Sequence, residues 1–314
     1  MHHIFRTLVP ALFALAAITG WTPAAAADCT AAERAVADRA LQLSASDQRA
    51  SIAAHLPWGA PRETVPADNE RLLVQRDFVI RHDGDLRVPL WTAERVDAAR
   101  LGRIPREDCF RADPRLPAAE AGTPRDYDEP IYDQGHMAPF ANQTSSAVAG
   151  HNSFVMSNMT PQTCQLNRGI WQILEGITRL WATEHGTVYV LSGSVFDRDG
   201  NGRRDADSAA RRMRSRSGTE RVAVPSHFYK VIAIRRPDGS VSTLSIMLPH
   251  NEANPDGPAA LRYLQQHVTT IEAIEQVAGI DVFPSGARIE EARTLWPFTG
   301  RQPRSLCNVG RTTN

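Results

Sequence analysis

The chain has very little lysine: Lys230 is its only one, and the other members of its 35 basic residues are arginines. Because 35 acidic residues balance them, the formal net charge is zero. A protein that binds polyanions through its overall charge is basic, so any such contact here must come from a local patch. None of the 4 cysteines shows a C-x-x-C spacing. A zinc ribbon or a thioredoxin-type redox site is therefore a poor interpretation.

Only one segment is strongly apolar, and it lies at the N-terminus. Residues 8–18 follow a start that carries a single charge, Arg6, and precede the small residues 24–27. This pattern is typical of a secretory signal peptide at residues 1–27, cleaved after Ala27, and the apolar run is too short to span a bilayer. No later segment is apolar enough to cross a membrane. We therefore expect a secreted or periplasmic protein with no membrane attachment after cleavage.

The remainder, residues 28–314, is predicted to form a single α+β domain, because no repeat or flexible linker divides it. Segment 28–55 should be a helical extension, and segment 285–314, rich in arginine and proline, a tail on the surface. Between them we expect a central antiparallel or mixed sheet covered by helices. The expected elements are a hairpin of 72–80 and 86–91 around Asp83-Gly84, strands at 187–195, 227–235 and 241–248, and helices within 258–277.

The cysteines all lie beyond the predicted cleavage site. An even number in an exported chain indicates two disulfides, for which three pairings exist. We favour Cys29–Cys109 together with Cys164–Cys307, the second of which would staple the loop before residue 167.

The stretch 132–179 is the most informative part of the chain. A helix is predicted from Asn167, and Trp171, Glu175 and Arg179 follow in steps of four. Because an α-helix has about 3.6 residues per turn, these side chains form a slowly rotating stripe along one side. Polar groups on an otherwise buried helix are costly unless they serve each other or a ligand. Amide and carboxylate oxygens are ligands that Mg²⁺ accepts.

A histidine precedes this helix at the end of a strand-like run. The run finishes in Asp133-Gln134-Gly135-His136, and a neutral imidazole can accept a proton near neutral pH. The layout therefore predicts a base that activates water while one divalent metal holds a phosphate.

Simpler explanations exist for the same residues. Glu175 and Arg179 could form only an exposed i, i+4 pair, and Asn158 could only close a turn. The motif around His136 favours catalysis, whereas for the other histidines we prefer structural roles: His151, His185, His227, His250 and His267.

Three motifs resemble the DNA/RNA non-specific endonuclease family, the ββα-metal nucleases that include mitochondrial endonuclease G. The motifs are Asp-Gln-Gly-His-Met-Ala-Pro at 133–139, Ser-Asn-Met-Thr-Pro-Gln at 157–162, and Asn-Arg-Gly-Ile-Trp at 167–171 with Glu175. The likeness runs in order from about residue 56 to residue 284. It implies a sheet-and-helix fold that contains a ββα-metal (His-Me finger) motif.

The resemblance also implies roles for individual residues. Gln134, Arg106 and Arg168 are assigned to nucleic-acid contacts, although Gln134 stands where the family usually has arginine, which removes a positive charge. The other roles are a general base at His136, a direct metal ligand at Asn167, metal-bound waters held by Glu175, phosphate charge neutralised by Arg179, orientation of His136 or a phosphate oxygen by Asn158, and a turn braced by Asp133.

The resulting expectation is an enzyme that hydrolyses phosphodiester bonds of DNA and RNA without sequence specificity, with Mg²⁺ as cofactor or Mn²⁺ in its place. One alternative is a weak or inactive nucleic-acid-binding protein on the same fold, with Gln134 as the sign of decay. Another is a nuclease toxin, which would require an immunity protein. The sequence leaves the oligomeric state open, with a homodimer as one option.

Two features lie outside the motifs. Segment 203–221 holds seven arginines and is either an arm that follows phosphates or a solvated loop. Just before it, acidic and amide residues match the front of an EF-hand-like calcium loop, although Ser208 stands where a bidentate Glu is expected. A structural Ca²⁺ and a polar, glycine-rich turn are both open for these positions: Asp197, Asp199, Asn201 and Asp205.

Overall fold

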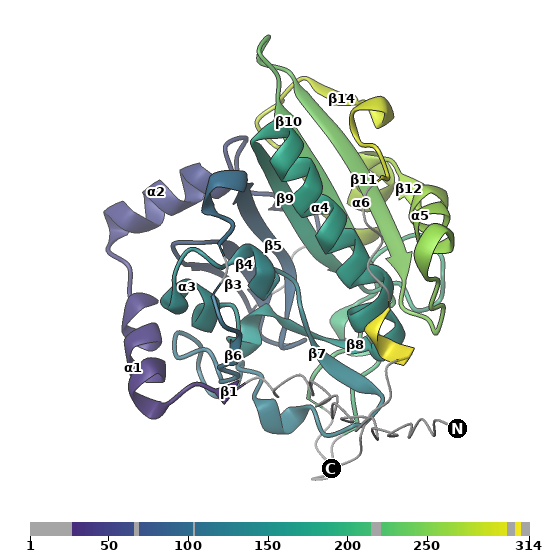
Figure 1. Cartoon of the computed structure of the whole chain (residues 1–314). Helices are drawn as coiled ribbons and strands as arrows, with labels where there is room; N and C mark the ends of the chain where they lie inside the picture. Colours follow the sequence, from purple (N-terminus) through teal and green to yellow (C-terminus); the bar gives the residue numbers. More distant parts are fainter. Residues whose placement is uncertain (1–26, 66–68, 103, 215–220, 300–304, 309–314) are drawn as a thin grey trace, which may run out of the picture.

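The computed structural model describes residues 27–65, 69–102, 104–214, 221–299 and 305–308 (Figure 1). The predicted signal peptide, residues 1–27, lies outside the described residues except for its last position. Within the described part of the chain, no helix combines the length and the apolarity needed to cross a bilayer.

A mixed sheet of eight strands forms the centre of the described structure, in the order β12-β11-β10-β9-β5-β4-β3 with β14 beside β11. β14 pairs in parallel with β11, and all other neighbours are antiparallel. The predicted α+β class with a mixed sheet is thus confirmed. The strands are β3 (Glu70–Val74), β4 (Val79–Asp83), β5 (Val88–Asp97), β9 (Thr187–Val195), β10 (His227–Arg235), β11 (Val241–Pro249), β12 (Val268–Thr269) and β14 (Ile289–Glu291).

The other strands form three separate pairs, of which β7 (Tyr132–His136) and β8 (Met159–Thr163) carry the motif residues. The two remaining pairs are β1 (Ala27–Asp28) with β6 (Glu107–Asp108), and β2 (Arg62–Glu63) with β13 (Ile280–Asp281). The α-helices are α1 (Ala31–Ala40), α2 (Ala45–His55), α3 (Ala147–Asn152), α4 (Trp171–His185), α5 (Gly257–Gln266) and α6 (Ile271–Ala278).

Polar residues set where the helices begin. α1 starts after Thr30, whose side chain accepts a hydrogen bond from the Glu33 N–H while the Glu33 carboxylate accepts one from the Thr30 N–H. Ser44 caps α2 in a similar way. Such caps satisfy backbone N–H groups that have no partner inside the helix. α1 and α2 thus lie within the segment 28–55 that the sequence predicts as a helical extension.

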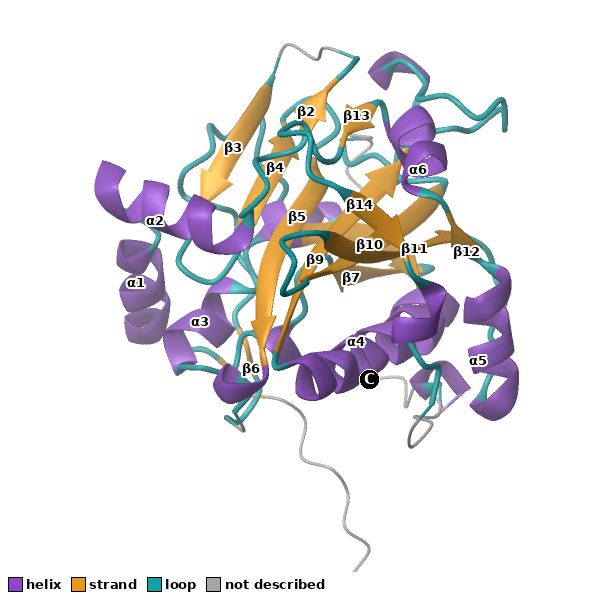
Figure 2. Ribbon diagram, turned by 90° about the horizontal axis from the view of Figure 1, so that it is seen from above, coloured by secondary structure: helices purple, strands orange, loops and turns teal. Residues whose placement is uncertain are grey.

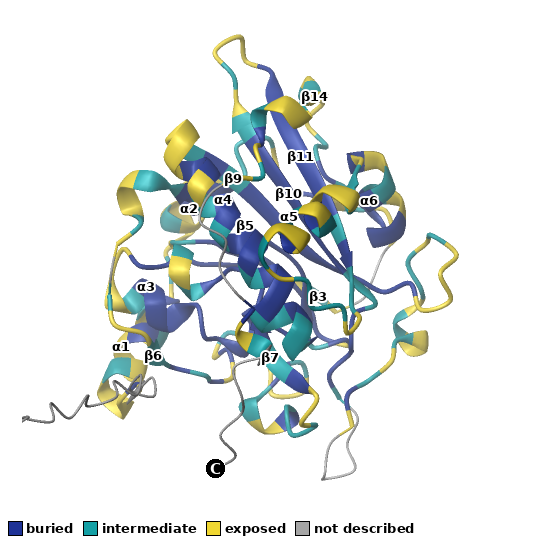
Figure 3. Ribbon diagram, turned by 45° about the vertical axis from the view of Figure 1, so that its right-hand side comes forward, coloured by how far each residue is buried: buried dark blue, intermediate teal, exposed yellow. Residues whose placement is uncertain are grey.

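The sheet separates two apolar layers, with α4 and α5 on one face and α6 on the other (Figure 2). Alternation along β10 creates both layers: Phe228 and Ile232 pack toward α4, whereas Tyr229 and Val231 pack toward α6. Lys230 lies between Phe228 and Ile232 and therefore shares the face of α4. Figure 3 shows the central strands buried beneath this cover.

Two predicted segments differ from the structure. The expected strand 72–80 is two strands, β3 and β4, because the chain turns between them and the Gln75 N–H donates to the Phe78 carbonyl. The hairpin around Asp83-Gly84 is formed by β4 and β5. The segment 285–314 is not only a surface tail, since β14 joins the sheet and Trp296, 1% exposed, packs against Trp181.

Both favoured disulfides are present, Cys29–Cys109 and Cys164–Cys307. The second fastens η8 (Leu306–Asn308) beside η5 (Leu166–Ile170), the turn that precedes α4. The end of the described chain is thereby tied to the motif region.

Candidate active site

β7, β8 and α4 form the predicted strand–strand–helix unit (Figure 1). The strands pair antiparallel, with Tyr132 opposite Thr163 and His136 opposite Met159. Gly135 is required beside His136, because a Cβ there would lie 2.2 Å from the Gln162 side chain. The two strands can therefore pack closely only with glycine at this position.

The helix does not start where the sequence predicts. Asn167 lies in η5, a π-type turn, and α4 begins at Trp171 after a kink at Gly169. A Cβ on Gly169 would lie 2.9 Å from Asn254 Oδ1 and 3.3 Å from Ser305 Oγ. The close packing of these two side chains accounts for glycine here. The regular stripe therefore includes Trp171, Glu175 and Arg179 but not Asn167.

Despite this kink, one cleft collects nearly all the predicted residues. Its volume is about 700 Å³. The predicted residues that line it are Arg106, Asp133, Gln134, His136, Asn167, Arg168, Glu175 and Arg179. The imidazole and the amide that the sequence assigns to one reaction thus face the same space.

His136 is 9% exposed, and its ring packs against Phe110 and Phe154 at centroid distances of 5.9 and 4.8 Å. No described residue forms a hydrogen bond with either ring nitrogen, and Nε2 is buried. Burial, helped by the charge of Arg106, lowers the pKa of His136 to about 3. The ring is therefore neutral near pH 7, and its buried Nε2 is not engaged by any described group. The indole N–H of Trp171 donates to the His136 carbonyl at 3.2 Å, which holds the strand end.

Asp133 organises the opposite wall of the cleft. Its carboxylate accepts from Asn167 Nδ2 at 3.2 Å and from Arg168 Nε at 2.9 Å. Since the amide nitrogen of Asn167 is engaged, its Oδ1 is available, and no described group donates to that oxygen. This arrangement agrees with the bracing role predicted for Asp133.

Glu175 supplies a second oxygen donor. Its side chain is 9% exposed, and its carboxylate has no hydrogen-bond partner among the described residues. Burial raises the pKa of Glu175, whereas the charges of Lys230 and Arg179 oppose that shift. Arg179 itself donates from NH1 to Asn142 Oδ1 at 3.1 Å. A buried, unbonded carboxylate that lines the same cleft as a free amide oxygen fits a hard divalent cation with water ligands.

Asn158 lies outside the cleft. Its fully buried amide accepts from the Ala138 N–H at 2.9 Å and donates to the carbonyls of Ala138 and Ser153 at 2.9 and 2.8 Å. With all these positions filled it does not reach a phosphate. Any influence on His136 passes through the backbone two residues beyond it.

Three buried polar side chains lie beneath α4 and were not predicted as part of the site. Lys230, Ser192 and Glu94 project from β10, β9 and β5 toward this helix, and each is 1% exposed. A single lysine within an apolar strand was the available signal.

Comparison with known proteins decides the family. A model of the DNA/RNA non-specific endonuclease family matches residues 60–288. The chain belongs to this family.

Named relatives agree with this assignment. Human mitochondrial endonuclease G is 30% identical over 217 residues, 68% of this chain and 70% of that protein. Nuclease C1 of Cunninghamella echinulata var. echinulata is 28% identical over 225 residues, 69% of this chain and 84% of that protein. A crystal structure of an EndoG/EndoGI complex superimposes with a TM-score of 0.62 at 27% identity, covering 75% of this chain and 92% of that one. The chain is thus a nuclease of the endonuclease G type of fold.

The calcium hypothesis for this nuclease stays a prediction. Ligand atoms of Asp197, Asp199 and Asp205 all lie within 4.8 Å of one another. However, Asp197 accepts from the backbone N–H groups of Asn201 and Gly202, each at 3.0 Å. The Asn201 side-chain oxygen accepts from the Arg203 N–H at 2.9 Å. The loop therefore holds its own shape through hydrogen bonds.

The arginine-rich segment is mostly engaged in structural contacts. The guanidinium of Arg204 lies 2.9 Å from Asp207 and 3.3 Å from Asp83. Arg212 donates to the Asp85 and Arg221 carbonyls at 2.8 and 2.7 Å. Residues 215–220 of the segment lie outside the described residues. The described contacts favour a folded loop over a free phosphate-binding arm.

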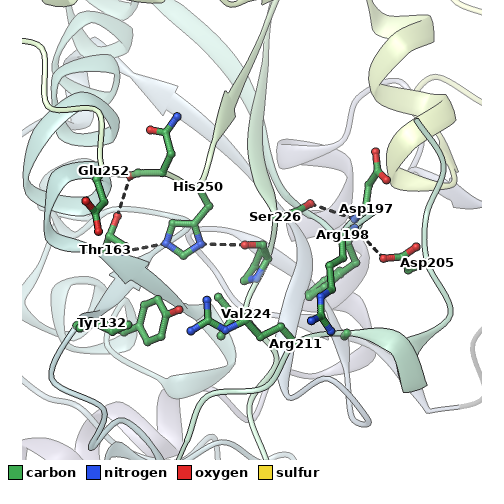
Figure 4. Close-up of a pocket in the computed structure, with 15 residues that line it drawn as sticks. Tyr132, Thr163, Asp197, Arg198, Asp205, Arg211, Val224, Ser226, His250 and Glu252 are labelled. Atoms are coloured by element: carbon green, nitrogen blue, oxygen red, sulfur yellow. Dashed lines mark hydrogen bonds between the residues drawn. The ribbon is translucent and has the colours of Figure 1, made fainter. Parts of the chain in front are cut away.

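A second cavity, of about 360 Å³, adjoins the cleft and shares Tyr132 with it (Figure 4). Its histidine, His250, has both ring nitrogens engaged: Nε2 accepts from the Thr163 N–H at 2.9 Å, and Nδ1 lies 2.8 Å from the Pro225 carbonyl. Charges of both signs line the cavity, among them Arg211 and Asp205. Among the described residues, His136 of the cleft therefore has a free ring nitrogen, whereas His250 of the cavity has both ring nitrogens in hydrogen bonds.

Proposed function

We propose that this nuclease hydrolyses phosphodiester bonds of DNA and RNA without sequence specificity, with His136 as general base and one Mg²⁺ at Asn167. The observation that carries the proposal is the cleft that joins a neutral, unbonded imidazole to a free amide oxygen and an unbonded carboxylate. Mn²⁺ should substitute, because both cations accept oxygen donors.

The residues divide the reaction among them. His136 accepts a proton from the attacking water through a ring nitrogen that no described group occupies. Arg179, held by Asn142, offsets charge that develops on the phosphate. Asn167 would bind the cation directly and Glu175 through water, and the bound cation supplies Lewis-acid stabilisation of the phosphate. Arg106, Arg168 and Gln134 line the cleft where a nucleic-acid backbone would pass.

We also propose export to the periplasm or the medium. The leader-like sequence at residues 1–27 and two disulfides support an oxidising compartment. The human relatives named endonuclease G and EXOG are described as mitochondrial. Cell fractionation with an antibody would test the proposal, and a full-length protein found only in the cytoplasm would refute it.

The catalytic proposal is tested with the purified mature chain, plasmid DNA and single-stranded RNA. Cleavage of both should require Mg²⁺ or Mn²⁺ and should stop with a chelator. His136→Ala should lower cleavage about 10²- to 10⁴-fold while Mn²⁺ still binds, whereas Asn167→Ala should weaken Mn²⁺ binding as well. A wild-type chain that binds both nucleic acids without cutting them would support the inactive binding protein instead.

A further inference from the structure

Lys230 lies in the middle of β10 and is 1% exposed. Lysine is almost never this buried unless it is paired, because removing an ammonium from water costs several kcal/mol. On the α4 face of the same strand, the positions two residues before and after it carry Phe228 and Ile232. A hydrophobic side chain would therefore satisfy packing at this position, and the charge must be balanced by specific neighbours.

Two contacts fix the ammonium beneath α4. Nζ donates to Ser192 Oγ at 2.6 Å, from the residue directly opposite in β9. It also lies 4.2 Å from the centroid of the Trp171 ring, a cation–π contact with the first residue of α4.

Trp171 links this ammonium to the general base. The face of its indole rests on Lys230, while its N–H donates to the His136 carbonyl at 3.2 Å. Glu175 follows Trp171 by four residues and so lies one turn further along the same side of α4. The ammonium therefore contacts the residue, Trp171, that joins the strand of His136 to the helix of Glu175.

The nearest anionic groups act on Lys230 through their charge and not through a direct ion pair. Burial lowers the pKa of Lys230, and the carboxylates of Glu175 and Glu94 oppose that shift, although no described carboxylate lies within 4.0 Å of its Nζ. Glu94 accepts from Asn142 Nδ2 at 2.9 Å and from Gln143 Nε2 at 2.7 Å. Asn142 in turn accepts from Arg179, so this arginine of the cleft belongs to the same network.

We propose that Lys230 is a positioning residue of the catalytic centre, which holds Trp171 in place by direct contact beneath α4, acts on Glu175 through its charge, and thereby sets the affinity of the cleft for a divalent cation. The inference rests on the proposed metal role of Asn167 and Glu175. Without the ammonium, Arg179 and Arg106 remain as counter-charges of the Glu175 carboxylate, and the Trp171 ring loses the group beneath it.

The test measures Mn²⁺ affinity by isothermal titration calorimetry on the full mature chain. Lys230→Met keeps the length of the side chain and removes its charge. It should weaken Mn²⁺ binding about 10- to 100-fold, as loss of a supporting residue does at metal sites. Lys230→Arg should recover part of the affinity, and Ser192→Ala should lose less than Lys230→Met. The matched control is Tyr229→Phe, which alters the next residue of β10 on the opposite face of the sheet.

Each result decides the question. If Lys230→Met folds and binds Mn²⁺ as Tyr229→Phe does, the ammonium only fills space and the inference is wrong. If Lys230→Met does not fold, Ser192→Ala decides, and a normal Mn²⁺ affinity of Ser192→Ala would overturn the idea.

At saturating Mn²⁺, kcat of Lys230→Met should fall while KM for DNA stays within about threefold, since substrate contacts are unchanged. A wild type that binds Mn²⁺ but cleaves no nucleic acid refutes the proposed function alone, because the affinities still test Lys230. A wild type that binds no Mn²⁺ refutes the metal role and this inference together.

Discussion

The cleft and the neighbouring cavity each contain a buried histidine, and the two differ in how their nitrogens are used. Burial lowers the pKa of both side chains, to about 3 for His136 and about 4 for His250. His250 bridges Thr163 and Pro225 and joins three segments of the fold (Figure 4). His136 has no such partner among the described residues.

This contrast separates a reactive group from a structural one. Buried polar atoms in folded proteins nearly always find hydrogen-bond partners, so an unpartnered one calls for an explanation. The carboxylate of Glu175 and the Oδ1 atom of Asn167 share this property with His136, and all three line one cleft. A lowered pKa by itself does not mark the site, since both histidines have it. An unpartnered ring nitrogen alone does not mark it either, since His82 Nδ1 is also buried without a partner. The site is marked by the three unpartnered groups of His136, Glu175 and Asn167, which line one cleft.

The largest expected effect distinguishes the two histidines directly. His136→Ala should lower kcat about 10²- to 10⁴-fold, the usual contribution of a general base, because no other group in the cleft replaces the imidazole. Plasmid nicking and RNA cleavage at fixed Mg²⁺ measure the loss.

His250→Ala is the partner variant. It should leave kcat per folded molecule unchanged but reduce the free energy of unfolding by about 1–3 kcal/mol, because the Thr163 N–H and the Pro225 carbonyl lose their partner. Urea denaturation measures this stability. If His250→Ala were inactive yet fully stable, the proposed division between the two sites would be wrong.

The two disulfides extend the comparison to the chain ends. Paired serine substitutions at Cys29 and Cys109, or at Cys164 and Cys307, should each cost about 2–5 kcal/mol of stability. Only the second pair should also weaken Mn²⁺ binding, because it fastens η8 beside η5, where Asn167 lies. Calorimetric titration of both variants, below their unfolding temperatures, measures this. Equal Mn²⁺ affinities would show that η8 does not support the metal site.

The sequence predicted the strands best where runs rich in β-branched and aromatic residues end at turn residues. β9 and β10 have the expected bounds, because each is such a run and a clear turn follows β10. The break between β3 and β4 was missed, since Gln75 and Phe78 carry no glycine or proline signal. The buried part of the tail was missed because Trp296 finds its partners only in three dimensions.

For the site, local motifs predicted which residues meet, but not the backbone that brings them together. The kink at Gly169 depends on Asn254 and Ser305, which are distant in sequence. Lys230 was identified as unusual only in its rarity, because its contacts with Trp171 and Ser192 come from a strand and a helix that pack across the core.

A smaller effect concerns pH and stability. Burial lowers the pKa of five histidines in the folded state: His55, His82, His136, His227 and His250. In the unfolded chain the histidine pKa is about 6.5, so below this pH the unfolded chain binds more protons than the folded one. The free energy of unfolding is therefore highest above about pH 6.5 and declines as the pH falls toward about 4. Each histidine contributes a slope of up to about 1.4 kcal/mol per pH unit. Urea denaturation at pH 7.5, 6.0 and 5.0 should show the decline, and His136→Asn or His250→Asn should each flatten it. An unchanged slope in both variants would contradict the assignment.

The smallest effect tests what Gln134 means for the cleft. Gln134→Arg restores the residue type usual in the family at a half-buried position between Asp133 and the cleft. A guanidinium there should raise kcat/KM for DNA by about two- to tenfold, roughly 1 kcal/mol, since a partly exposed charge contributes little more than that. The gain should shrink from 50 to 200 mM salt, because added ions screen the interaction with phosphate. Gln134→Met, which has a similar size and no charge, controls for shape. A Gln134→Arg variant slower than wild type at every salt concentration would contradict the expected gain. The loss would then come from Asp133, because its carboxylate would pair with the introduced guanidinium and move away from Asn167.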